Sequence, residues 1–165
     1  MTDQIESLSA EVGRHLKAAG WILTTAESCT GGWIAKAITD IPGSSGWLDR
    51  GFVTYSDAAK QDMLGVQPQS LAEHGAVSEA VVQEMALGAL ARSHAQVSIA
   101  VSGIAGPGGG SEAKPVGTVC VALACHDHSG AMTWTCHFDG DRDAVRRQTV
   151  IFALERLIEA VADGR

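Results

Sequence analysis

The chain is predicted to be a single α/β domain in which helices cover a mixed β-sheet. Short apolar, β-branched segments alternate with longer segments whose apolar residues recur every three or four positions. Near the end, two strand-like segments follow each other without a helix between them, which adds an antiparallel hairpin to the sheet. The length of 165 residues suits one domain over residues 1–165, without an internal repeat.

The first half of the chain is predicted to alternate between helices and strands. Asp3 and Glu6 form a plausible capping pair for an opening amphipathic helix, which Gly20 ends. A turn cluster at residues 42–46 separates the next helix from the second strand. The expected elements after the opening helix are a strand over residues 21–26, a helix over 33–41 and a strand over 52–55.

The second half is predicted to contain two further helices before the hairpin and one after it. Ser56 or Asp57 caps a helix that reaches Leu64, and Gly65 and Pro68 interrupt it. The remaining expected elements are a helix capped by Ser78, a central strand over residues 97–102, hairpin strands over 118–124 and 132–138, and a last helix that begins near Asp141.

Charge and hydropathy exclude several classes of partner. The formal net charge of −7 repels a polyanionic backbone, so nucleic acid is not an expected partner. A small anionic substrate stays possible, because one or two local cations suffice to hold a phosphate. The first twenty residues lack the pattern of a signal peptide, and no segment approaches the roughly 18 apolar residues of a membrane span. A cytoplasmic protein without membrane contact is therefore expected.

Ser28 and Lys60 are the candidate catalytic residues. Ser28 follows the first predicted strand and precedes a helix, and Lys60 occupies the same strand-to-helix setting after the next strand. Ligands of open α/β sheets bind at the carboxyl ends of the strands. A serine and a lysine placed there suggest a hydrolase. Cys29 adjoins Ser28 and is an alternative nucleophile, whereas the other three cysteines are interpreted as buried, reduced thiols: Cys120, Cys125 and Cys136.

A glycine-rich loop and an arginine are candidate binding features. Residues 103–117 contain six glycines and two prolines, yet they match neither standard phosphate-binding fingerprint. The loop is thus either a binding loop or a tight connection. Arg142 starts the last helix, where a cation opposes the helix dipole, so either an anionic substrate group or a salt bridge to Asp139 or Asp143 explains it. The histidines lack ligand spacing, and no metal site is expected.

Six short segments together resemble the C-terminal domain of the competence/damage-inducible protein CinA. Both the residues of these segments and their order are specific, and the resemblance runs from about Ile5 to Ile158. The segments are Ala26-Glu27-Ser28-Cys29-Thr30-Gly31-Gly32, Tyr55-Ser56 with Lys60, Gly75-Ala76-Val77-Ser78, Ser102-Gly103-Ile104-Ala105-Gly106-Pro107, Lys114-Pro115-Val116-Gly117-Thr118 and Gly140-Asp141-Arg142.

The resemblance implies a three-layer α/β/α sandwich with a mixed, mostly parallel five-stranded sheet. Stand-alone members of this family are nicotinamide-mononucleotide deamidases, so it also implies an amidohydrolase that releases ammonia without a metal or organic cofactor. Ser28 would be the nucleophile and Lys60 its general base. The other residues implied to line the site are Tyr55, Thr30, Ser45, Ser102 and Arg142.

The chemistry of amide hydrolysis assigns tasks to these groups. Lys60 accepts a proton only when neutral, which burial and the cationic pyridinium of the substrate favour. The N–H groups of Thr30 and Gly31 are the expected oxyanion hole. The glycine loop, with Gly103 and Gly106, and Arg142 or Lys114 are expected to hold the phosphate.

Three alternatives stay open at this point. The domain could bind a pyridine nucleotide without consuming it, hydrolyse another small carboxamide, or use Cys29 as the nucleophile. A homodimer is also expected, since Trp33 and Trp47 suit a subunit contact as well as a core.

Overall fold

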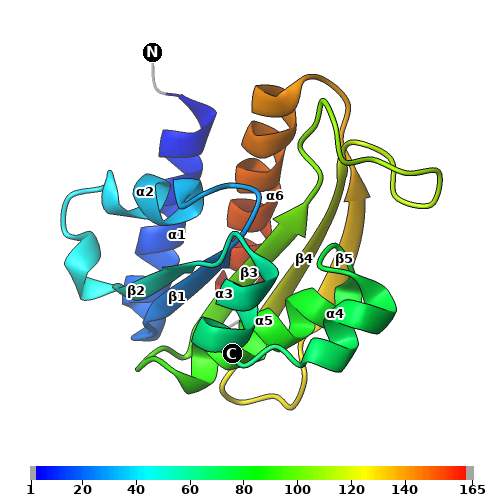
Figure 1. Ribbon diagram of the computed structural model, residues 1–165. Helices are drawn as coiled ribbons and strands as arrows, with labels where there is room; N and C mark the ends of the chain where they lie inside the picture. Colours follow the sequence, from blue (N-terminus) through cyan, green and yellow to red (C-terminus); the bar gives the residue numbers. More distant parts are fainter. Residues whose placement is uncertain (1–2, 163–165) are drawn as a thin grey trace.

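The computed structural model describes residues 3–162 and shows a five-stranded sheet between two layers of helices (Figure 1). The strands are β1 Leu23–Glu27, β2 Leu48–Val53, β3 Val97–Gly103, β4 Thr118–Cys125 and β5 Met132–His137, in the order β2-β1-β3-β4-β5. β1 pairs in parallel with β2 and β3, whereas β4 is antiparallel to β3 and to β5. All strands except β4 therefore run in one direction, which confirms the predicted mixed sheet.

Three helices cover each face of the sheet, so the predicted three-layer sandwich is also confirmed. One layer contains α1 Gln4–Ala19, α2 Trp33–Thr39 and α6 Arg142–Ala162. The other contains α3 Asp57–Leu64, α4 Pro68–His74 and α5 Glu79–Ala91 (Figure 1).

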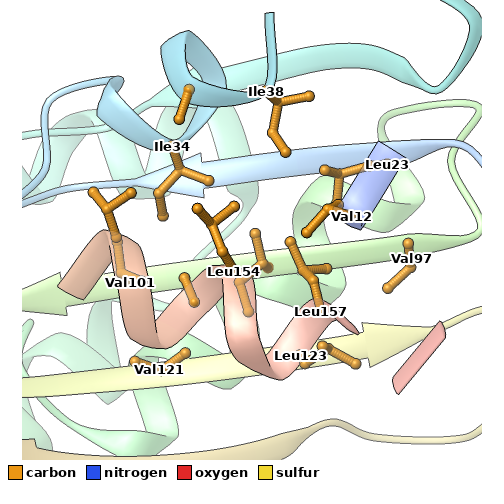
Figure 2. Close-up of a cluster of buried hydrophobic side chains, with 14 of the residues drawn as sticks. Val12, Leu23, Ile34, Ile38, Val97, Val101, Val121, Leu123, Leu154 and Leu157 are labelled. Carbon is orange, nitrogen blue, oxygen red and sulfur yellow. The ribbon is translucent and has the colours of Figure 1, made fainter. Parts of the chain in front are cut away.

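The two faces of the central strands differ in the size of their side chains. Large residues face α1, α2 and α6, where Leu154 and Leu157 pack against them (Figure 2). Small residues face α5, which lets this helix lie close to the sheet, and the Ser98 hydroxyl donates to the Ala86 carbonyl at 2.7 Å. The large set is Val97, Ile99, Val101, Val119, Val121 and Leu123; the small set is Ser98, Ala100, Cys120, Ala122 and Ala124.

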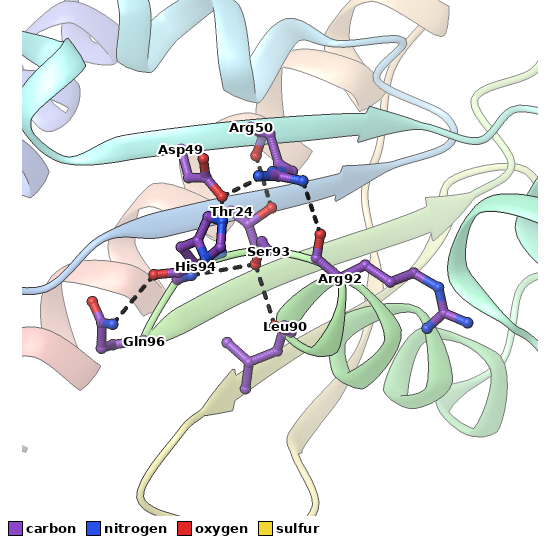
Figure 3. A network of polar contacts seen from close by, with 9 residues as sticks. Thr24, Asp49, Arg50, Leu90, Arg92, Ser93, His94 and Gln96 are labelled. Carbon is purple, nitrogen blue, oxygen red and sulfur yellow. Dashed lines mark hydrogen bonds and ion pairs between the residues drawn. The ribbon is translucent and has the colours of Figure 1, made fainter.

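A polar network fixes the edge strand β2 at the amino end of the sheet (Figure 3). The Asp49 carboxylate accepts from Arg50 Nε at 2.8 Å and from the His94 N–H at 2.9 Å. Arg50 also donates to the Arg92 carbonyl at 3.1 Å. These bonds tie β2 to the turn between α5 and β3, far from the carboxyl ends of the strands.

Three local predictions differ from the structure. Asp3 precedes α1 but makes no side-chain cap, because its carboxylate accepts from Arg147 of α6 at 2.6 Å instead. β2 begins at Leu48, four residues before the predicted start, since pairing with β1 overrides its polar residues. The short helix α4 was not predicted; Pro68, interpreted as an interruption, occupies its first turn, where proline is favoured.

Candidate active site

The nucleophile candidate is positioned by the ends of three parallel strands. β1 ends at Glu27, and Ser28 continues its ladder by donating its N–H to the Val101 carbonyl of β3 at 3.0 Å. On the other side, the Thr54 N–H donates to the Glu27 carbonyl at 2.8 Å and continues β2. Ser28 and the segment that leads into α3 therefore leave the sheet side by side.

Lys60 lies in α3, the helix that follows β2, and its side chain extends to Ser28. The Ser56 hydroxyl caps α3 by accepting from the Ala59 N–H at 3.0 Å, which starts the helix where Lys60 faces the sheet. Lys60 Nζ lies 3.0 Å from Ser28 Oγ, 2.8 Å from the Thr54 carbonyl oxygen and 3.4 Å from the Tyr55 carbonyl oxygen. The structure thus brings the two residues within hydrogen-bonding distance.

The surroundings of Lys60 favour the neutral amine. The residue is only 1% exposed, and this burial lowers the pKa of its amine; the nearby Asp57 carboxylate opposes the effect. No carboxylate within residues 3–162 forms an ion pair with it. A neutral amine has two hydrogens, which the Thr54 and Tyr55 carbonyls accept. Its lone pair is then left for the Ser28 hydroxyl proton.

A cavity of about 250 Å³ opens in front of this pair. At its rim Arg142 donates to the Tyr55 hydroxyl at 3.2 Å and to the Gly106 carbonyl at 2.8 Å. Tyr55 is 64% exposed, so its ring forms part of the entrance. The candidate residues that line the cavity are Ser28, Tyr55, Lys60, Ser102, Gly103 and Arg142.

The turn that carries Ser28 is held by two charged residues that sequence reasoning missed. The fully buried Glu27 carboxylate accepts from Thr30 Oγ1 at 2.5 Å and from the N–H groups of Ile34 and Ala35 at 2.8 and 3.0 Å, so it caps α2. Burial raises the pKa of this carboxyl, and the hydrogen bonds oppose the rise. Arg146 donates to two carbonyls of the same turn. A glutamate at the end of an otherwise uncharged strand was the available signal for Glu27.

Cys29 is unsuited to nucleophilic attack. It is buried, and this burial raises the pKa of its thiol to about 12. The reactive thiolate is therefore scarce at neutral pH. The structure therefore favours the Ser28 hydroxyl over the Cys29 thiol as the nucleophile.

The sequence matches the CinA C-terminal domain family over residues 5–161. The chain belongs to this family. Nicotinamide-nucleotide amidohydrolase PncC of Shigella flexneri is 60% identical over 158 residues, covering 95% of each chain, and the protein of that name from Pseudomonas putida is 54% identical over 157 residues, covering 95% of this chain and 97% of its own. In structure, this CinA-family domain superimposes on the competence/damage inducible protein CihA from Agrobacterium tumefaciens with a TM-score of 0.93, 46% identity and 98% of both chains covered.

Five other predicted residues of this CinA-family domain do not line the cavity: Ser45, Thr30, Gly31, Lys114 and Gly106, whose carbonyl accepts from Arg142. Ser45 is in the short 3-10 helix Ser44–Gly46, which precedes β2, so β2 separates it from Ser28 by its length of roughly 16–20 Å. Contrary to the expectation, Ser45 does not line this cavity. Thr30 and Gly31 face a separate hollow beside Arg146, and Lys114 donates to the His74 carbonyl at 2.5 Å in a neighbouring pocket.

The predicted oxyanion donors differ in their availability. The Gly31 N–H already donates to the Ser28 carbonyl at 3.1 Å, so it cannot serve while this turn is intact. The Thr30 hydroxyl is bound to Glu27, which leaves only the main-chain amide of Thr30 for this task. Within residues 3–162 no group of three acidic, cysteine or histidine side chains is arranged to hold a metal ion, and none of the helices has the length and hydropathy to cross a membrane.

Proposed function

We propose that this protein hydrolyses the carboxamide of nicotinamide mononucleotide to nicotinate mononucleotide and ammonia, with Ser28 as nucleophile and Lys60 as general base. The observation that carries the proposal is the 3.0 Å contact between Ser28 Oγ and the buried Lys60 Nζ. The names of the PncC relatives, similar over nearly the full chain, support the same substrate.

The reaction divides into two acyl transfers. Lys60 takes the Ser28 proton as Oγ bonds to the carboxamide carbon, and the carbonyl π electrons move to oxygen. When the oxyanion collapses, the C–N bond breaks and Lys60 returns the proton to the departing nitrogen, which leaves as ammonia. Water then gives a proton to Lys60 and attacks the acyl carbon. The bond between this carbon and Ser28 Oγ breaks, Lys60 returns the proton to Oγ, and the carboxylic acid product leaves.

The charges around the cavity suit a nucleotide with a cationic ring. Arg142 has no ion-pair partner among the described residues, although the chain carries a net charge of −7, so its guanidinium is available to a phosphate. Asp57 lines the same cavity and offers a carboxylate to the pyridinium. The ring charge in turn keeps Lys60 neutral.

The direct test measures ammonia release from nicotinamide mononucleotide. We expect Ser28→Ala and Lys60→Arg to lower kcat by about 10²- to 10⁴-fold, because the first removes the nucleophile and a guanidinium cannot accept a proton. Lys36→Arg is the matched control, since Lys36 is exposed and pairs with Asp40 on its own helix. If Lys60→Arg keeps the turnover of the control, Lys60 is not the base.

The homodimer and the cytoplasmic location are part of the proposal. Trp47 is buried in the hydrophobic core, and Trp33 packs against the same core. The two tryptophans therefore give no support for a subunit contact. Light scattering of the purified protein tests the predicted mass of a dimer.

A further inference from the structure

Arg146 has an unusual set of partners for a helix arginine near the protein surface. Its Nε donates to the Cys29 carbonyl at 3.1 Å, and its terminal nitrogen donates to the Thr30 carbonyl at 3.2 Å. Both carbonyls belong to the turn that carries Ser28, 116 and 117 residues away in sequence. No carboxylate in the part of the chain described here pairs with Arg146. Both of these hydrogen bonds of Arg146 therefore go to main-chain carbonyls of one turn.

The planarity of the peptide bond turns this contact into a constraint on an amide. In a trans peptide the C=O of one residue and the N–H of the next point in opposite directions. Because the Cys29 carbonyl points at Arg146, the Thr30 N–H points away from Arg146. The hollow beside Arg146 and the catalytic cavity are separate, and Cys29 lines the catalytic one.

Two other amides of the turn are already engaged. Ser28 donates its N–H to Val101 and Gly31 donates its N–H to Ser28. On its other side the turn is fixed by Glu27, which holds the Thr30 hydroxyl at 2.5 Å. Thr30 is therefore held at its hydroxyl and its carbonyl, while its N–H keeps one orientation.

We propose that Arg146 is a positioning residue: its guanidinium fixes the Cys29–Thr30 peptide so that the Thr30 N–H donates to the oxyanion formed when Ser28 attacks the carboxamide. This inference rests on the proposed acyl transfer to Ser28. Arg146 itself touches neither the substrate nor the reacting atoms.

The central experiment compares Arg146→Met with Arg147→Met in the ammonia assay. Methionine keeps much of the apolar stem but has no donor, and Arg147, the next residue, pairs at the surface with Asp3. Loss of one oxyanion donor typically lowers kcat by about 10²- to 10³-fold. We expect Arg146→Met to lower kcat by about 10²-fold with KM within about 3-fold of wild type, and Arg147→Met to change neither by more than about 2-fold. An Arg146→Met kcat within about 3-fold of the control overturns the proposal.

A second measurement separates orientation of the amide from support of the fold. In an analogue of the nucleotide with an aldehyde in place of the carboxamide, Ser28 Oγ bonds to the aldehyde carbon and Lys60 takes the hydroxyl proton, so the former carbonyl oxygen occupies the hole as an oxyanion. We expect Arg146→Met to weaken this analogue by about the factor lost in kcat/KM, and to leave the affinity for nicotinate mononucleotide unchanged. Equal weakening of both ligands, with a matching fall in Tm, would show that Arg146 only supports the fold.

Variants with smaller perturbations keep the test decisive if Arg146→Met is unstable. Arg146→Lys retains one donor and should recover part of kcat, and added guanidinium should raise kcat of Arg146→Ala while ammonium at the same concentration does not. Absence of both effects contradicts the proposal. The acyl-transfer mechanism itself is tested separately by the ammonia assay on Ser28→Ala and Lys60→Arg, and it fails if these variants keep their turnover.

Discussion

Lys60 and its neighbour Asp57 determine the pH range in which the proposed reaction runs. Burial lowers the pKa of the amine, and the Asp57 carboxylate raises it. The base form of Lys60 must predominate for turnover, so kcat/KM should rise with pH through the pKa of the free enzyme. The ascending limb is therefore expected below the ordinary lysine value of about 10.4.

Asp57→Asn should move that limb to lower pH, because it removes the charge that stabilises the ammonium form. The pH dependence of kcat/KM measures the shift, and Asp62→Asn, an exposed position on the same helix, is the control. A limb that moves to higher pH, or that moves equally in both variants, would contradict this role of Asp57.

At the level of single residues, the sequence predicted that Ser28 and Lys60 lie close together, but it did not predict the residues that hold the turn of Ser28 in place. Ser28 and Lys60 follow strands with recognisable apolar patterns, and parallel strand ends meet at one edge. Glu27 and Arg146 act through contacts with the main chain of the turn. The charge at the end of the strand was a signal for Glu27, whereas neither residue type nor spacing reveals the partners of Arg146. Ser45 was placed by resemblance alone, and the order of its 3-10 helix and β2 puts it at the other end of the sheet.

Among the elements, the contact between α3 and α5 controls where Lys60 lies. Gly88 of α5 faces the end of α3, and a Cβ atom added there would lie 2.0 Å from the Leu64 carbonyl oxygen. Gly88→Ala must therefore push α3 away, at an expected loss of about 1–3 kcal/mol in the free energy of unfolding. Since α3 carries Lys60, kcat should fall as well.

Chemical denaturation and the ammonia assay together check this prediction. Gly46→Ala is the matched control, because no atom lies within 4 Å of the added Cβ. A Gly88→Ala protein with the stability and turnover of the control would show that the two helices have room to separate.

The elements themselves were predictable where local pattern and packing agree. The hairpin of β4 and β5 and the helices with a clear apolar stripe fall within a few residues of their expected bounds. β2 and α4 were harder, because their polar composition is overruled by pairing with β1 and by packing of Leu71 on α5. Bounds that depend on partners cannot be read from the segment alone.

For the whole molecule, the net charge is negative, so we expect the phosphate of the nucleotide to bind through the local positive charge of Arg142 at the cavity. Inactive Ser28→Ala offers a binding assay, and nicotinamide mononucleotide at 100 times its Kd should stabilise it by about 2.7 kcal/mol. For a chain of this size, that corresponds to a rise in Tm of about 5–10 °C.

Adding Arg142→Ala should remove most of this rise for the nucleotide and leave the small effect of free nicotinamide unchanged. Arg147→Ala in the same background is the control. If Arg142→Ala weakens both ligands equally, the guanidinium contacts the ring end of the substrate and the phosphate lies elsewhere.

The burial of Lys60 also links catalysis to the pH dependence of the stability of the whole fold. Between the lowered pKa of the folded state and the ordinary lysine value, the unfolded chain holds one proton more than the native protein, so native stability increases with pH across that interval. Within that interval the amine of Lys60 releases a proton when the chain folds. Lys60→Met should thus melt at a higher temperature than the wild type near pH 7, and the gap should narrow as the buffer becomes alkaline.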